Sequence, residues 1–315
     1  MEHRKFINLL NELSDELTAT QAEKLIVALH AGSGEDAVCA LIEQSAREDL
    51  SCPHCEGTHL QHWGKSHGLQ RYRCMSCAKT FNALTGTPLA RLQHKDLWLT
   101  FAHALQHSHS VRRAAQDCGI ANATSFHWRH RFLAAQKHAK ARRLEGIVEV
   151  DETFILKSAK GQRGLARSPR KRGGKAKKPG LSKEHVPVLI ARDRSGAMVD
   201  AVLPDRSEKA IHQVLERVVS KDALLCMDGD KALIAFARSQ GIEYEPVIVS
   251  RGERVCEGVL HVQNVNAYVS RLKGWMKPFN GVATKYLQNY LGWRRLLESQ
   301  GHAITPEFCL SAALG

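Results

Sequence analysis

The sequence predicts a mixed α/β core that follows two small N-terminal modules. Two apolar stretches predict the core: residues 147–155 and 223–227 have the composition of buried strands, and each carries an acid at or near its end. Four cysteines in two close pairs predict a separate metal-bound module before that core. The chain has 315 residues, enough for roughly two or three domains.

The composition indicates an acidic partner and a reducing compartment. The formal net charge is +13 and the isoelectric point is near 9.4, which favours nucleic acid as the partner over a merely solvated basic surface. No apolar run approaches the roughly 18 residues that span a membrane, and no signal-type segment follows Met1. We therefore expect a cytoplasmic protein without membrane contact, in which the nine cysteines serve metal binding and packing more than disulfides.

The first module is expected to be a zinc ribbon over residues 49–84, preceded by a helical segment over 1–48 that shows no chemistry. The zinc ribbon is predicted by the pair Cys52 and Cys55, which is followed after 18 intervening residues by the pair Cys74 and Cys77. Each pair can form a knuckle, and four thiolates make a closed tetrahedral zinc site. A redox motif would need only one pair. The zinc is therefore expected to be structural.

The second module is expected to be an all-α helix-turn-helix domain over residues 90–140. A short helix over 110–119 ends in glycine, and a second helix over 122–132 follows after a tight turn. We expect Arg129 and Arg131 on the second helix to contact DNA, while the aromatic residues of this helix pack.

The strand at 147–155 carries Asp151 next to Glu152. Neighbouring side chains on a strand point to opposite faces, so these two acids cannot both face water on one side. One interpretation is an ordinary strand end, and the other is that Asp151 is a metal ligand. The following basic loop, 157–185, contains eleven Lys or Arg and no acid between residues 157 and 183, which favours a polyanion that runs past the site.

The order of elements after residue 145 is strand, strand, strand, helix, strand, helix, strand. This order predicts a ribonuclease H-like core over residues 145–300, in which the first and fourth strands are neighbours. Asp228, at the end of the fourth strand, can then meet Asp151. A later helix over 261–276 carries Asn266 and Lys273 on one face, because seven residues make almost two turns. Residues 301–315 are expected to be a tail.

Together these motifs resemble the bacterial insertion-sequence transposases of the DDE superfamily, in the ISXO-like group that has an N-terminal zinc ribbon. The resemblance rests on the four cysteines, on Gly-Ile-Val-Glu-Val-Asp-Glu-Thr, on Met-Asp-Gly, and on the helix from His261 to Lys273. Most members place a glutamate seven residues before the lysine, whereas this chain has Asn266. It is similar here to a subgroup with an Asp-Asp-Asn-Lys tetrad, in which a neutral amide replaces a stronger carboxylate ligand.

The resemblance implies metal-dependent strand cleavage and strand transfer at the ends of an insertion sequence. Asp151, Asp228 and Asn266 would hold two Mg²⁺ or Mn²⁺ ions, and Lys273 would contact a phosphate. Asn266 is preferred because only it has a lysine seven residues later; its rivals are Asn264, Glu253, Glu257 and Glu298.

The partner implied is double-stranded DNA, both the element ends and the target, bound by a homo-oligomer that lies on the bacterial nucleoid. Within the basic loop, Arg170, Lys171 and Arg172 are expected to bind DNA without reading its sequence. Two alternatives stay open. One is a zinc-ribbon and helix-turn-helix transcription regulator without catalysis, and the other is a ribonuclease H-like nuclease that cuts without joining.

Overall fold

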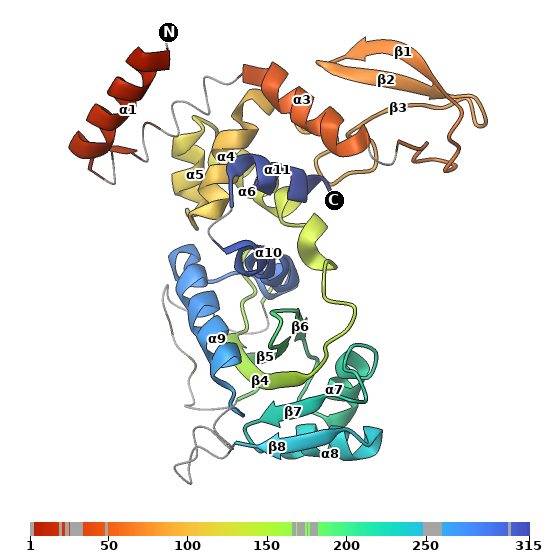
Figure 1. Cartoon of the computed structure of the whole chain (residues 1–315), viewed down its shortest axis with the longest axis vertical. Coiled ribbons are helices and arrows are strands. Elements are labelled where there is room, and N and C mark those ends of the chain that lie inside the picture. The colour runs from red at the N-terminus through yellow and green to blue at the C-terminus, as the bar shows by residue number, and fades with distance from the viewer. Residues whose placement is uncertain are drawn as a thin grey trace. The chain divides into compact units, whose positions relative to one another are not determined.

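The computed structural model divides the chain into two compact units (Figure 1). Unit 1 comprises residues 1–128 together with 305–315, and unit 2 comprises residues 129–304. The residues that the structure describes are 3–18, 21–22, 25, 34–47, 50–165, 168, 174, 176, 182–247, 260–301 and 304–315. Within these ranges no helix is long and apolar enough to cross a bilayer.

Unit 1 combines a small antiparallel sheet with several helices. The sheet has the order β1-β2-β3, with a turn at His67 and Gly68 between its first two strands. Part of the N-terminal segment expected to be helical lies outside the described residues. The elements of unit 1 are α1 (His3–Glu16), α3 (Gly34–Arg47), β1 (Leu60–Ser66), β2 (Leu69–Cys74), β3 (Thr80–Asn82), η1 (Lys95–Leu97), α4 (Trp98–Gln106), α5 (Val111–Asp117), α6 (Asn122–Phe132) and α11 (Pro306–Leu314), although the end of α6 from Arg129 onward belongs to unit 2.

The expectation of a tail after residue 300 is wrong, because α11 belongs to the core of unit 1. Thr305 accepts a hydrogen bond from the backbone N–H of Phe308 and so caps the helix. The helix packs on α4 and α3, and its Cys309 and Leu310 are fully buried. Nothing in the local sequence of a short apolar helix says which surface it covers, so its place depends on the tertiary fold.

Unit 2 contains a five-stranded mixed sheet with helices on both faces. The strand order is β6-β5-β4-β7-β8, in which β4 pairs with β5 antiparallel and with β7 parallel. The first and fourth strands of this unit are therefore neighbours, as the sequence predicted. The elements are η2 (Ala135–Lys137), β4 (Ile147–Leu156), β5 (His185–Asp193), β6 (Met198–Val202), α7 (Glu208–Leu215), β7 (Leu224–Met227), α8 (Lys231–Gln240), β8 (Glu243–Pro246), α9 (Gln263–Met276), η4 (Lys277–Phe279), η5 (Thr284–Tyr286) and α10 (Leu287–Gln300).

Helices cover both faces of this sheet (Figure 1), and a separate hydrophobic cluster lies on each face. On one face, α7 and α8 pack against a cluster that includes Val148, Val150 and Met227. On the other face, α9 and α10 pack against β5 and β6 through residues such as Val188 and Tyr268. Because side chains alternate along a strand, these clusters fix which face every residue of β4 and β7 meets.

Candidate active site and metal centre

Two carboxylates lie side by side where β4 and β7 run parallel. Val150 of β4 pairs with Met227 of β7. The residues that follow this pair, Asp151 and Asp228, are therefore neighbours as well. Neighbouring strands are about 4.8 Å apart, which brings the two acids to one edge of the sheet. The negative charge of Asp228 acts on Asp151, where it raises the pKa.

Both acids lie on the face that α9 covers. Val148 and Val150 belong to the cluster under α7 and α8, so Glu149 and Asp151 point to the opposite face. Met227 also belongs to that cluster, which places Asp228 on the same side as Asp151.

The environment of Asp151 is partly desolvated. Burial raises the pKa of Asp151 to about 6, while the backbone N–H of Glu152, which donates to Asp151 Oδ1 at 2.7 Å, lowers it. The positive charge of Lys273 lowers the pKa as well. Lys273 on α9 is therefore close enough to influence a carboxylate on β4, and the expected helix meets the expected strand.

Asn266 and Lys273 occupy one edge of α9. The buried stripe of the helix includes Val265 and Leu272, and Asn266 and Lys273 each follow one of these residues. A separation of seven residues leaves both side chains at nearly the same angle around the axis. Asn266 is exposed, and it shares the edge from which Lys273 acts on Asp151.

The rival third ligands are engaged elsewhere or lie outside the described residues. Glu298 is held by three guanidinium groups, those of Arg192 at 3.0 Å, Arg294 at 2.6 Å and Arg271. These contacts outweigh the burial of Glu298 and lower its pKa. Asn264 donates its side-chain amide to Glu149 Oε1 at 2.8 Å. Two further rivals, Glu253 and Glu257, are among the residues that the structure does not describe.

Two features of the site escaped sequence reasoning. Glu149 has a fully buried side chain and receives hydrogen bonds from the first turn of α9. The sequence did contain an indication of this, because Glu149 lies two residues before Asp151 on one strand and therefore points to the same face of the sheet. The second feature is Arg206, which bridges Glu152 at 2.6 Å and Asp230 at 2.5 Å. This bridge holds Glu152 away from Asp151, on the opposite face of β4.

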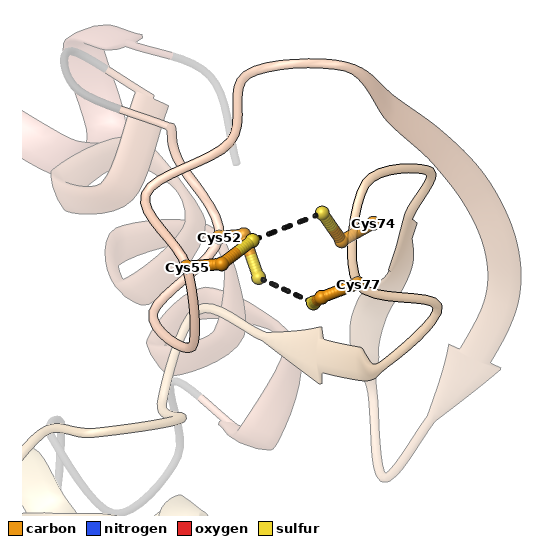
Figure 2. A group of neighbouring side chains, drawn as sticks. All are labelled: Cys52, Cys55, Cys74 and Cys77. Atoms are coloured by element: carbon orange, nitrogen blue, oxygen red, sulfur yellow. Dashed lines mark hydrogen bonds between the residues drawn. The ribbon is translucent and has the colours of Figure 1, made fainter.

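The four cysteines of unit 1 form a cluster that can hold a metal ion (Figure 2). Their sulfur atoms all lie within 4.8 Å of one another, with Cys52 Sγ 3.7 Å from Cys77 Sγ and Cys55 Sγ 3.6 Å from Cys74 Sγ. Tetrahedral zinc with bonds of about 2.3 Å separates its sulfur ligands by about 3.8 Å, so the spacing fits zinc. Among the described residues, this is the one group of at least three His, Cys, Asp or Glu that could share an ion.

The backbone around the cluster also favours thiolates. Backbone N–H groups of Cys77 and Ser76 contribute to lowering the pKa of Cys74 to about 6. The backbone N–H of Gly57 lowers the pKa of Cys55, but hydrogen bonds with the Cys77 and Cys74 thiols raise it to about 12. Gly57 packs tightly on the cluster, because an added Cβ would lie 3.4 Å from the sulfurs of Cys55 and Cys74 and would force Ser76 Oγ, at 3.0 Å, to shift by a few tenths of an ångström.

The placement of α6 corrects one expected DNA contact. Arg129 is 1 % exposed, and its guanidinium lies 5.0 Å from the centre of the Phe279 ring inside unit 2. Burial lowers the pKa of Arg129, and a hydrogen bond with Tyr290 acts against this effect. Arg129 therefore does not present a charge to DNA, whereas Arg131 is half-buried.

The aromatic residues of α6 also differ from expectation. Phe126 was expected to pack, but it is 47 % exposed, next to the exposed His127. Trp128 does pack, with its ring at a right angle to that of Phe101. Arg170, Lys171 and Arg172 of the basic loop lie outside the described residues.

Comparison with known proteins identifies the domain that contains this site. Residues 143–294, which contain the paired acids and α9, match the model of the ISXO2-like transposase domain. This part of the chain is therefore a transposase domain of the DDE class. Within that class, the domain that residues 143–294 match is ISXO2-like.

A curated relative and two solved structures are also similar to the chain. An uncharacterised protein in the transposable element ISH50 of Halobacterium salinarum is 27 % identical over 250 residues, which cover 78 % of this chain and 84 % of the relative. A pre-cleavage Mos1 transpososome is 12 % identical with a TM-score of 0.18, covering 66 % of this chain and 75 % of that one. A Mos1 strand transfer complex is 14 % identical with a TM-score of 0.20, covering 66 % and 74 %.

Proposed function

We propose that the chain is an insertion-sequence transposase that binds the ends of its element and performs metal-dependent strand cleavage and strand transfer. The observation that carries this proposal is the parallel pairing of β4 and β7, whose register puts Asp151 beside Asp228 under α9. The strand order supports a ribonuclease H-like core for unit 2. The family match supports the transposase chemistry.

The donor atoms suit a hard divalent cation. Asp151 and Asp228 offer carboxylate oxygens and Asn266 offers an amide oxygen, which are ligands that Mg²⁺ and Mn²⁺ accept. Two bound ions would activate the attacking water or 3′-hydroxyl and stabilise the leaving oxygen. Lys273 would hold a DNA phosphate near Asp151, since its ammonium already acts on that carboxylate. Arg206 keeps Glu152 and Asp230 paired with each other through its guanidinium, outside the ligand set.

Unit 1 supplies the proposed recognition modules. The four-cysteine cluster would hold a structural zinc ion, because four thiolates leave no open position for a substrate. In α5 and α6, Ser125 Oγ donates to the backbone oxygen of Val111 at 2.9 Å, which fixes the two helices of the proposed helix-turn-helix to each other. The element ends and the target would be double-stranded DNA, bound by a homo-oligomer.

A cleavage assay tests the proposed function. Duplex DNA with the terminal repeats of the element, incubated with the full chain and Mg²⁺, should be nicked at the repeat ends and then joined to target DNA. Asp228→Asn removes a charged ligand without changing its shape, so nicking should fall by at least about 100-fold. Asp222→Asn, at an exposed turn before β7, is the matched control and should retain the wild-type rate. Repeat binding without nicking would indicate a regulator, and nicking without joining would indicate a nuclease.

The start of the basic loop offers a described surface for the DNA backbone. A hollow of about 460 Å³ is lined by Lys157, Lys160 and Lys285, with hydroxyls from Ser158 and Thr284 and no acid. Reciprocal hydrogen bonds of 2.9 Å join the backbone N–H of Ser158 to Thr284 Oγ1 and the N–H of Thr284 to Ser158 O. These hydrogen bonds hold together the two backbone segments that carry the three lysines.

We expect the double variant Lys160→Gln/Lys285→Gln to weaken binding to all duplexes alike. Each lost phosphate contact should reduce the slope of log K against log salt by roughly 0.9, so the pair should reduce it by roughly 1.8. Fluorescence anisotropy at several salt concentrations measures the slope. The control is Lys209→Gln/Lys231→Gln, which removes two exposed charges from α7 and α8. Equal slopes for both double variants would show that the hollow does not bind phosphate.

A further inference from the structure

A buried carboxylate joins the strand of Asp151 to the helix of Asn266. The side chain of Glu149 is 0 % exposed, and it lies on β4 two residues before Asp151 and on the same face. Glu149 Oε2 accepts the backbone N–H groups of Asn264 at 2.8 Å and Val265 at 3.0 Å. Its other oxygen, Oε1, accepts the side-chain amide of Asn264 at 2.8 Å.

These contacts replace a missing helix cap. The first N–H groups of a helix have no partner within the helix, and a side chain at the N-cap position commonly accepts one of them. In α9 the N-cap residue is Val262, which has no acceptor, and no cap hydrogen bond is made by a side chain there. Glu149 supplies the acceptor from another element, 115 residues earlier in the chain. The negative charge of Glu149 also suits the positive end of the helix dipole.

A guanidinium group and a histidine ring complete the surroundings of Glu149. Arg194 Nη1 lies 3.0 Å from Glu149 Oε1, and His261 Nδ1 lies 3.3 Å from the same atom. Both carboxylate oxygens are thus fully used by donors. The contact is directional, so a shift of α9 by one residue would leave a buried charge without these partners.

We propose that Glu149 is a positioning residue that fixes α9 on β4 and so sets the distance of Asn266 and Lys273 from Asp151. Asn266 lies one residue after Val265, whose N–H Glu149 holds, and Asp151 lies two residues after Glu149. A single side chain therefore connects the two halves of the ligand set. This inference rests on the proposed function for the role of Asn266, whereas the attachment of α9 to Glu149 is independent of it.

The test compares Glu149→Gln with Asp200→Asn in the full chain. Glutamine keeps the shape but replaces one acceptor oxygen by a donor that faces other donors. Asp200 on β6 is a similarly buried carboxylate, paired with Arg295 at 2.5 Å, and its loss removes an ion pair that makes no hydrogen bond to the first turn of α9. Hydrogen exchange measured by mass spectrometry should increase in the first turn of α9 for Glu149→Gln only. Mn²⁺ binding, followed by electron paramagnetic resonance without DNA, should weaken roughly 10-fold or more for Glu149→Gln only.

A double-mutant cycle with Asn266→Ala separates positioning from general stability. If Glu149 acts through Asn266, the variant Glu149→Gln/Asn266→Ala should bind Mn²⁺ about as weakly as either single variant. Asp200→Asn combined with Asn266→Ala should bind like Asn266→Ala alone. Additive losses in the Glu149 cycle would overturn the proposal. An unchanged Mn²⁺ affinity in Asn266→Ala itself would refute the proposed ligand set instead, and the exchange of α9 would still decide whether Glu149 holds the helix.

Asn264→Asp covers the case in which Glu149→Gln does not fold. Asn264 is half-buried, and an aspartate there would set a second carboxylate against Glu149. We expect faster exchange in the first turn of α9 and weaker Mn²⁺ binding. Tighter Mn²⁺ binding would contradict the proposal, because it would mean that residue 264 itself reaches the ion.

Discussion

Asn266→Ala is expected to lower the rate of strand cleavage by at least about 100-fold in Mg²⁺, as Asp228→Ala does, while folding and DNA binding persist. Loss of an outer partner of a metal ligand already costs 10- to 100-fold, and loss of a ligand should cost no less. Asn266 is exposed and beside the buried stripe of α9, so its truncation leaves the packing of Val265 and Leu272 intact. Single-turnover nicking of a terminal-repeat duplex measures the rate, and gel shift measures binding.

Two further variants decide whether the amide oxygen is the relevant group. Asn266→Glu adds a charge and a methylene, and should retain part of the activity if α9 can shift to accept the longer side chain. Ser270→Ala changes an exposed residue on α9 between Asn266 and Lys273, and should keep the wild-type rate. If Asn266→Ala nicks at the wild-type rate, Asn266 does not belong to the site, and Glu257 becomes the next residue to test.

Cys74→Ser is expected to abolish zinc binding and unfold the β1-β2-β3 sheet, with unit 2 still folded. Structural zinc contributes about 10–16 kcal/mol in small zinc-binding peptides, far more than a sheet of this size can replace. The apolar cluster around the cysteines has Phe81 as its one buried residue other than cysteines. Zinc content by mass spectrometry of metals and the thermal unfolding of the full chain measure the two effects.

Cys118→Ser is the matched control for this change. Cys118 is a buried thiol of unit 1 whose pKa burial raises to about 12, and it is not part of the four-cysteine cluster. Its replacement should lower stability modestly and leave the zinc content unchanged. Wild-type protein purified without chelator that contains no zinc would contradict the assignment of the cluster.

The parts of the fold that local patterns encode were predictable. The order of strands and helices after residue 145 predicted that the strands of Asp151 and Asp228 would be neighbours, and the parallel register confirms their pairing. Each Cys-x-x-Cys pair folds as a local turn, and the antiparallel pairing of β1 with β2 brings the two turns together. The seven-residue spacing of Asn266 and Lys273 likewise follows from helix geometry alone.

The parts that depend on distant partners were not predictable. In the sequence, nothing distinguishes Glu149 from other acids on strands. Its role depends on the first turn of α9, whose Asn264, 115 residues later, donates its backbone N–H to Glu149. The position of Arg129 on the second helix of the expected helix-turn-helix predicted a DNA contact, but Phe279 and Tyr290 pack against this side chain in the structure. The apolar residues of α6 are spread around the helix, so periodicity does not indicate which side another element will cover.

The position of α11 determines the order in which the protein can be completed during synthesis. Every residue of unit 2 leaves the ribosome before Pro306, whereas the core of unit 1 needs Cys309, Leu310 and Ala313 to cover α4. Unit 2 can therefore finish folding while unit 1, although made first, still has an open apolar face. A premature stop codon between the end of α10 and Pro306 would yield a chain in which the sheet that carries Asp151 and Asp228 is complete, while the apolar face of α4 in unit 1 stays uncovered.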